Sequence, residues 1–280
     1  PRPERTRRTT RPYRIIDAVT PVAFGGNPAA VFILDEPIPE PSMQAIASEM
    51  NLSETAFVHP ADPRGRRLIR WFTPTDEVPL CGHATLASAR SLLEEGQPFP
   101  LRLDSASGPL EVHLEEDGRL RLDFPADPPA AQDPPDGFLS SLGLPSGVET
   151  TPLQGRNLWI VPVATEAMFR ATRPDFNAMR SVAAGSALGV AVTAPGDAPD
   201  VDFVSRFFAP WVGVDEDPVT GVAHTVLTPY WAERLGQDEL SARQLSARGG
   251  ELTVRHHGDR VHLNGQAVVV AEGRMVAPLS

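Results

Sequence analysis

The sequence predicts an α+β protein of two similar domains. Its 280 residues suit two domains, because one domain usually holds about 100 to 200 residues. Strand-like segments outnumber helical ones in both halves, and the halves repeat one order of elements. We expect one domain over 13–124, a second over 150–268, and a C-terminal strand near 269–280 that returns to the first domain.

The first half alternates strands with two helices. Strands are expected at 13–19, 29–34, 54–58, 67–72, 101–104, 110–115 and 119–124. A helix begins near Pro41, because apolar side chains recur at helical spacing from Met43 to Met50. A second helix lies in the almost uncharged stretch from Pro79 to Ala89. A helix that is apolar all round is usually buried, so we expect this one inside its domain.

The second half begins after a proline-rich stretch. Residues 125–149 show little periodicity and are typical of a linker or crossover. The strands expected beyond it are 157–163, 188–193, 201–210, 252–256, 260–263 and 267–272. A short helix is expected at 175–184, and a longer one within 213–236.

Two segments repeat one pattern. The run RWFTP at 70–74 corresponds to RFFAP at 206–210, and each precedes an acidic loop and an almost uncharged helix. The first helix opens near Gly82 and the second near Gly221. If the two domains face each other, both helix N-termini meet at one cleft. Unpaired N–H groups and the helix dipole favour a carboxylate ligand there.

The composition excludes several classes of enzyme. All 25 basic residues are arginine, so the lysine of a P-loop and the lysine of a pyridoxal-phosphate or Schiff-base enzyme are missing. The formal net charge of −11 argues against nucleic-acid binding. No CxxC or HExxH spacing occurs, so we expect no metal.

The single cysteine cannot form an internal disulfide, which suits a reducing compartment. No apolar run reaches the 18 residues of a membrane span, so no membrane partner is expected. Residues 1–12 hold five arginines and lead into no apolar signal region, so we interpret them as a disordered arm. The expected location is the cytoplasm.

Four motifs carry a family resemblance. They are GGNP at 25–28, NLSETAF at 51–57, PLCGHAT at 79–85 and DEDPVTG at 215–221. In this order they resemble the phenazine-biosynthesis PhzF-like family, a relative of diaminopimelate epimerase. The resemblance implies two domains, each a curled mixed sheet around a central helix, with the active site between them. It also implies a homodimer that needs no cofactor and acts on a small carboxylate substrate.

Glu54 is the first candidate for catalysis. In a strand it shares a face with Ala56 and Val58, and it is the one charged residue there. Desolvation on an apolar face raises the proton affinity of a carboxylate, as a general acid/base near neutral pH requires. A solvated edge residue is the alternative. The resemblance implies that Glu54 is the catalytic acid/base.

His83 and Asp217 are the other catalytic candidates. By the resemblance, His83 lies in the site at a helix start, where it can donate a hydrogen bond or shuttle a proton. Asp217 precedes the second helix, where an aspartate also serves as a cap or turn residue. Backbone donors for a substrate carboxylate are expected at Gly82, Gly221 and Thr220.

Three further positions refine the substrate site. Asn27 is either a substrate contact, as the resemblance suggests, or a turn residue. Val222 stands where phenazine-pathway members carry serine. It offers only its backbone N–H to a carboxylate, which points to a different small acid. Cys81 matches the first of two opposed cysteines in related racemases, but Thr220 replaces the second, so Cys81 is left out of the catalytic set.

The sequence therefore predicts an isomerase that moves a proton between carbons of a small carboxylic acid, with Glu54 as acid and base. Two alternatives stay open. One is an epimerase or racemase in which Glu54 works with Cys81 or Asp217 as unlike bases. The other is an inactive protein that only binds a small acid.

Overall fold

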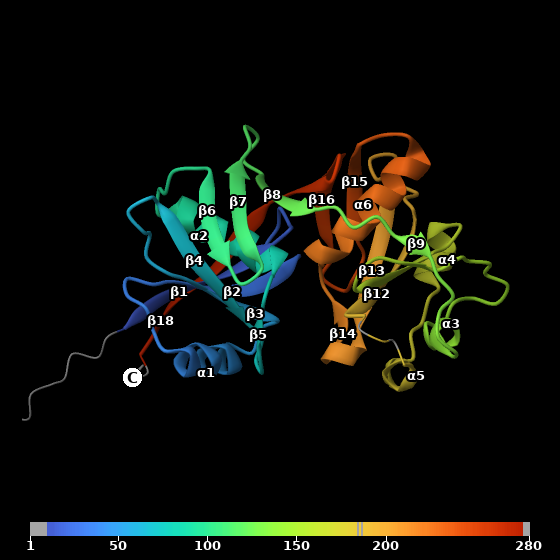
Figure 1. The fold of residues 1–280 in the computed structure, drawn as a ribbon, viewed down its shortest axis with the longest axis horizontal. Helices are drawn as coiled ribbons and strands as arrows, with labels where there is room; N and C mark the ends of the chain where they lie inside the picture. The colour runs from blue at the N-terminus through green and yellow to red at the C-terminus, as the bar shows by residue number, and fades with distance from the viewer. Residues whose placement is uncertain (1–9, 184, 186, 277–280) are drawn as a thin grey trace, which may run out of the picture. The chain divides into compact units, whose positions relative to one another are not determined.

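The computed structural model describes residues 10–183, 185 and 187–276, and these fall into two compact units (Figure 1). Unit 1 holds residues 10–122 and 265–276, and unit 2 holds the described residues of 123–264. Most of the expected arm, residues 1–9, lies outside the described residues. Arg11 and Pro12 already belong to the first strand. None of the helices in the described ranges is long and apolar enough to cross a membrane.

Unit 1 is a mixed sheet that packs against two helices. In spatial order its paired strands are β18 (Ala267–Met275), β1 (Arg11–Ala18), β2 (Asn27–Ile33), β3 (Glu54–Val58), β4 (Arg66–Phe72), β6 (Leu101–Ser105), β7 (Gly108–Leu114) and β8 (Leu120–Pro125). A short strand, β5 (Glu77–Val78), pairs with β4. The pairing of β18 with β1 brings the end of the chain back to unit 1.

The two helices of unit 1 bury their apolar surfaces in different ways. Helix α1 (Glu40–Met50) buries one stripe, Met43, Ile46 and Ala47, against aromatic side chains of the sheet. Helix α2 (Gly82–Glu94) packs against β1, β2, β3 and β18, and nearly every residue from His83 to Leu92 is buried. This confirms the expectation from the uncharged sequence that the second helix is an internal one.

Unit 2 is also a mixed sheet. In spatial order its paired strands are β9 (Ala130–Ala131), β10 (Leu153–Gln154), β11 (Leu158–Pro162), β12 (Gly189–Pro195), β13 (Phe203–Ala209), β15 (Glu239–Gln244), β16 (Gly250–His257) and β17 (Arg260–Gly265). Strand β14 (Val214–Asp217) pairs with β13, and the long helix α6 (Gly221–Leu235) follows it. The shorter helices are α3 (Phe138–Ser141), α4 (Glu166–Arg170), α5 (Phe176–Ser181) and the 3₁₀ turn η1 (Pro210–Val212).

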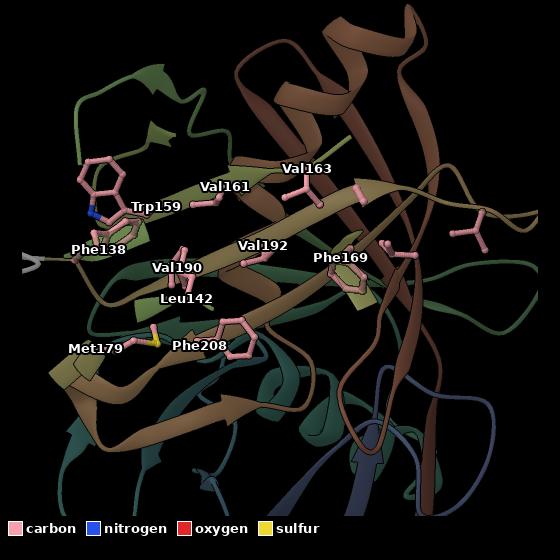
Figure 2. Close-up of a cluster of buried hydrophobic side chains, with 14 residues drawn as sticks. Phe138, Leu142, Trp159, Val161, Val163, Phe169, Met179, Val190, Val192 and Phe208 are labelled. Carbon is pink, nitrogen blue, oxygen red and sulfur yellow. The ribbon is translucent and has the colours of Figure 1, made fainter. Parts of the chain in front are cut away.

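The core of unit 2 joins its short helices to the sheet. Figure 2 shows Phe138, Leu142 and Met179 packed against side chains of β11, β12 and β13. Phe138 and Leu142 are fully buried although they lie in the segment 125–149, which the sequence presents as a linker. Leu139, Leu144 and Val148 of the same segment also pack against this cluster, so the segment is part of the core of unit 2.

The two units share one topology. Along both sheets the seven successive pairings are antiparallel, antiparallel, parallel, antiparallel, parallel, antiparallel and antiparallel. In each unit a two- to four-residue strand precedes the long helix, β5 before α2 and β14 before α6. The repeat predicted from RWFTP and RFFAP is therefore a repeat of the whole unit, and the α+β fold class is confirmed.

Candidate active site

Glu54 opens strand β3 directly after helix α1. Asn51 ends that helix in a left-handed conformation, with φ 49°, and turns the chain toward the sheet. The Glu54 side chain is 18% exposed and shares its face of the strand with the fully buried Ala56 and Val58. Solvent and small solutes therefore reach this carboxylate only in part.

His83 lies against Glu54. Its Nε2 is 3.1 Å from Oε2 of Glu54, an ion-pair distance, and the imidazole is almost fully buried in the first turn of α2. Burial disfavours the charged imidazole, but its interactions with the Cys81 sulfur and the Glu54 carboxylate outweigh burial and raise the pKa of His83 well above its usual value. Glu54 and His83 thus form a pair that can hold or pass one proton.

Cys81 completes this group from the position just before α2. Its Sγ lies 3.5 Å from Nδ1 of His83, and the side chain is buried. Burial, helped by the nearby Glu54 carboxylate, raises the pKa of the Cys81 thiol. A thiol with a raised pKa is uncharged at neutral pH, so Glu54 supplies the negative charge next to His83.

Asn27 holds the other nitrogen of the imidazole. Its Nδ2 lies 3.2 Å from Nδ1 of His83, and Ser53 Oγ donates to its Oδ1 at 2.9 Å. The amide suits both charge states of His83. With Nδ2 toward the ring it donates to neutral imidazole, and turned through 180° its oxygen accepts from imidazolium. Asn27 is fully buried, so these contacts position His83, and a contact of Asn27 with substrate stays a prediction.

The start of α2 adds backbone donors to this group. No side chain caps the helix at Cys81, and the geometry of any helix leaves its first N–H groups without partners inside the helix. Gly82 and His83 carry the first of these N–H groups. They lie where an anionic group of a substrate would be stabilised by the helix dipole.

In unit 2 the predicted residues form one continuous segment. Asp217 ends β14, Thr220 precedes α6, and Gly221 and Val222 begin that helix. The hydroxyl of Thr220 donates to Oδ2 of Asp217, and the Thr220 N–H donates to Gln244 Oε1 at 3.0 Å. Since the polar groups of Thr220 are used inside the chain, the backbone donors left for a ligand are those of the first turn of α6.

The predicted residues thus form two sets. Asn27, Glu54, Gly82 and His83 lie together in unit 1, and the segment from Asp217 to Val222 lies in unit 2. That these sets meet at one substrate stays a prediction. Sequence reasoning did not single out Ser53 or Gln244. Ser53 stands inside the NLSETAF motif beside Glu54, whereas no motif marks Gln244.

Glu54, Cys81 and His83 are also a candidate metal cluster, because one ligand atom of each lies within 4.8 Å of the others. Zinc would require bonds of about 2.0 to 2.3 Å to all three. Oε2 of Glu54 adjoins Nε2, whereas Sγ lies closer to Nδ1 (3.5 Å) than to Nε2 (4.0 Å). A metal held between Nε2 and Oε2 would be out of reach of Sγ until the Cys81 side chain rotated. The arrangement suits proton transfer better than metal binding.

Comparison with known proteins places this geometry in a family. The family model described as phenazine biosynthesis-like protein matches residues 16–273. An uncharacterized isomerase of Pseudomonas aeruginosa is 49% identical over 265 residues, which cover 94% of this chain and 97% of that protein. A phenazine biosynthesis-like domain-containing protein of Homo sapiens is 41% identical over 286 residues, which cover 95% of this chain and 99% of that protein.

Solved structures agree with this assignment. The crystal structure of a PhzF-family protein from Enterococcus faecalis is 41% identical and superposes with a TM-score of 0.87, covering 95% of this chain and 99% of that one. A predicted epimerase from Pseudomonas aeruginosa, 20% identical, shares the fold with a TM-score of 0.68 over 96% of this chain and all of its own. The fold is the expected diaminopimelate epimerase-like one, and these findings support an isomerase or epimerase. The chain belongs to the phenazine biosynthesis-like PhzF family.

Proposed function

We propose that this protein is a cofactor-independent isomerase that moves a proton between two carbons of a small carboxylic acid, with Glu54 as the general acid and base. The observation that carries the proposal is the Glu54–His83 contact at the uncapped start of α2. It combines a partly exposed carboxylate, a buried imidazole 3.1 Å away and backbone donors for an anion. These are the groups that proton transfer next to a carboxylate requires.

In this mechanism Glu54 removes a proton from a carbon that is conjugated to a carbonyl or carboxyl group. The electron pair left behind delocalises into the substrate, so no cofactor is needed. Glu54, now protonated, returns the proton to a second carbon of the same conjugated framework, and its carboxylate is regenerated. His83 stabilises the ionised carboxylate between turnovers. General acid–base catalysis of this kind supplies about 10²- to 10⁴-fold.

Asp217 and the first turn of α6 complete the proposed site from unit 2. The backbone N–H groups of Gly221 and Val222 would bind the substrate carboxylate, and Asp217 would assist the transfer of the proton. Val222 is 40% exposed as a residue, and its side chain offers no hydroxyl. We therefore propose a substrate that differs from that of the phenazine pathway.

The geometry of unit 1 argues against a racemase that uses Glu54 and Cys81 as opposed bases. Two bases on opposite faces of one carbon must each lie about 3 Å from it, and so about 6 Å from each other. The ligand atoms of Glu54, Cys81 and His83 lie within 4.8 Å of one another, which is closer than that separation. Proton transfer on a single face is therefore the better proposal.

Hydrogen exchange at carbon tests this function even while the substrate is unidentified. A panel of small unsaturated and keto carboxylic acids is incubated with the protein in D₂O, and loss of C–H signals is followed by ¹H NMR. We expect the wild type to catalyse exchange of a C–H hydrogen in at least one acid. Glu54→Gln should lower the rate of that exchange by about 10²- to 10⁴-fold. A folded Glu54→Gln variant with wild-type exchange would refute the mechanism. Tight binding with no exchange would identify a binding protein.

The proposal also includes a homodimer located in the cytoplasm. Light scattering on the purified chain should give twice its 30.2 kDa, and a monomer at micromolar concentration would contradict the dimer. Fractionation of the source cells should recover the protein with cytoplasmic markers.

A further inference from the structure

Gln244 ties together the segment that precedes helix α6. It is the last residue of β15 and is completely buried. Its Oε1 accepts from the Thr220 N–H at 3.0 Å, and its Nε2 donates to the Asp217 carbonyl oxygen at 2.8 Å and to Thr220 Oγ1 at 3.2 Å. One side-chain amide thus uses its acceptor and both of its donors on this segment.

His224 holds the same segment from within α6. Its Nδ1 lies 2.8 Å from the Thr220 carbonyl oxygen, which can only accept, so Nδ1 carries the proton. Burial lowers the pKa of His224 to about 4, so the imidazole is neutral at neutral pH and keeps this tautomer. The peptide groups of Thr220 are therefore fixed at N–H by Gln244 and at C=O by His224.

These contacts determine where the Asp217 carboxylate lies. The Thr220 hydroxyl accepts from Gln244 and donates to Oδ2 of Asp217, so the amide, the hydroxyl and the carboxylate form one chain of hydrogen bonds. The first N–H groups of α6 follow directly after Thr220 in the sequence. Gln244 thus fixes the carboxylate and the helix start relative to each other.

The strand itself indicates that this amide has a particular role. Leu240 and Ala242 precede Gln244 on the same face of β15, and both are buried and apolar. The face becomes polar only where it meets the Asp217 segment. Ser105 occupies the corresponding end of β6 in unit 1, and its hydroxyl donates to Gly108 within its own turn. The shared fold therefore does not require an amide at this place.

We propose that Gln244 is a positioning residue for the reaction, which holds Asp217 and the first turn of α6 in the geometry that receives the substrate. This inference rests on the proposed function. Buried amides that lose their partners leave polar groups unsatisfied, and a displacement of about 1 Å near a reacting group costs up to about 10²-fold in rate. We expect Gln244→Leu to lower kcat/KM by at least tenfold.

The test compares three variants in the D₂O exchange assay, with the acid that the wild type converts. Gln244→Leu removes all three contacts. Gln244→Glu keeps an acceptor for the Thr220 N–H, but its ionised carboxylate cannot donate to the Asp217 carbonyl. Gln237→Leu is the matched control, because Gln237 is an exposed glutamine that contacts Asp202.

We expect Gln237→Leu to match the wild type and Gln244→Leu to lose at least tenfold. Gln244→Glu should regain kcat/KM as the pH falls and the introduced carboxyl becomes protonated, because a carboxylic acid can both donate and accept. A folded Gln244→Leu variant within twofold of the wild type would overturn the proposal. If that variant does not fold, the pH profile of Gln244→Glu decides, and a profile parallel to that of the wild type would overturn it.

If the proposed isomerase function is wrong, the wild type will catalyse exchange in none of the acids. This outcome is distinct from a failure of the role proposed for Gln244. In that case acetate serves as the probe, with ¹H–¹⁵N spectra followed at Gly221 and Val222. Acetate should bind wild type at least fivefold more tightly than Gln244→Leu or, where that variant does not fold, than Gln244→Glu. Equal dissociation constants for the wild type and the variant would overturn the role of Gln244.

Discussion

Replacing His83 by glutamine should change how the stability of the protein depends on pH. The folded protein holds a proton on His83 at pH values where the unfolded chain has lost it, because contacts with the Cys81 sulfur and the Glu54 carboxylate raise the pKa of this imidazole despite its burial. The resulting stabilisation is fully present below about pH 6.5, the ordinary pKa of histidine. It is lost as the pH rises through the higher pKa of the folded state.

The size of this pH dependence follows from the difference of one bound proton between the folded and unfolded states. Between the two pKa values the unfolded state binds one proton fewer, so the free energy of unfolding falls by about 1.4 kcal/mol per pH unit. The nearly complete burial of His83 and its 3.1 Å contact with Glu54 keep solvent from screening the effect. His83→Gln lacks the titrating group and should lose this slope.

Urea unfolding followed by circular dichroism between pH 6.5 and 8.5 measures the effect. His113→Gln is the matched control, since His113 is a partly exposed histidine of β7 in the same unit. We expect the control to keep the slope of the wild type and His83→Gln to give a flatter line. If wild type and His83→Gln have equal slopes, the folded protein does not hold the extra proton on His83, and the reasoning about the pair fails.

Three further predictions concern single side chains. Cys81→Ser should keep exchange activity within threefold of the wild type, because the thiol is uncharged at neutral pH, and a loss as large as that of Glu54→Gln would make Cys81 a catalytic base. The free energy of unfolding of the wild type should fall by roughly 3 kcal/mol as the pH drops from about 6.5 to about 4, the pKa of His224 in the folded state. His224→Gln should lack this fall. Equal urea titrations of both proteins would contradict the prediction. Asn27→Leu should cost about 1–3 kcal/mol in urea unfolding, because it removes the buried amide that contacts His83 Nδ1 and accepts from Ser53 Oγ, whereas the exposed Asn177→Leu should cost far less.

Local patterns in the sequence are sufficient to predict many of the helices and strands of unit 1. The spacing of apolar residues from Met43 to Met50 predicts α1, and the lack of charge from Pro79 to Ala89 predicts that α2 is buried. The alternation around Glu54 predicts its strand and its apolar face. These features depend on residues close together in the chain, which is why periodicity reveals them.

Other features depend on contacts between distant residues. Strand β15 has the sequence ELSARQ, and its inward face of Leu240, Ala242 and Gln244 is too short and too polar to stand out. Gln244 acts on Asp217 and Thr220, which lie 27 and 24 residues before it. Strands β14 and β15 both pair with β13, which brings Asp217 and Gln244 together, so their relation is a property of the sheet and not of a local motif.

The proline-rich composition of residues 125–149 does not reveal that this segment is structured. Proline-rich sequence with little periodicity is typical of a linker. The segment nevertheless contains α3, and Phe138 packs against Trp159 with ring centroids 5.1 Å apart. The apolar residues that hold this segment in the core are irregularly spaced, so they give no periodic signal.

The stereochemistry of proton transfer tests the central proposal most directly. The acid that exchanges is converted in D₂O, and NMR of the product determines the face that receives the new hydrogen and how much of it is deuterium. Because one partly buried carboxylate removes and returns the proton, we predict delivery to the face from which the proton left, with some of the original hydrogen retained. Inversion at a single carbon with complete incorporation of solvent deuterium would contradict the proposal, since it requires a second base on the opposite face.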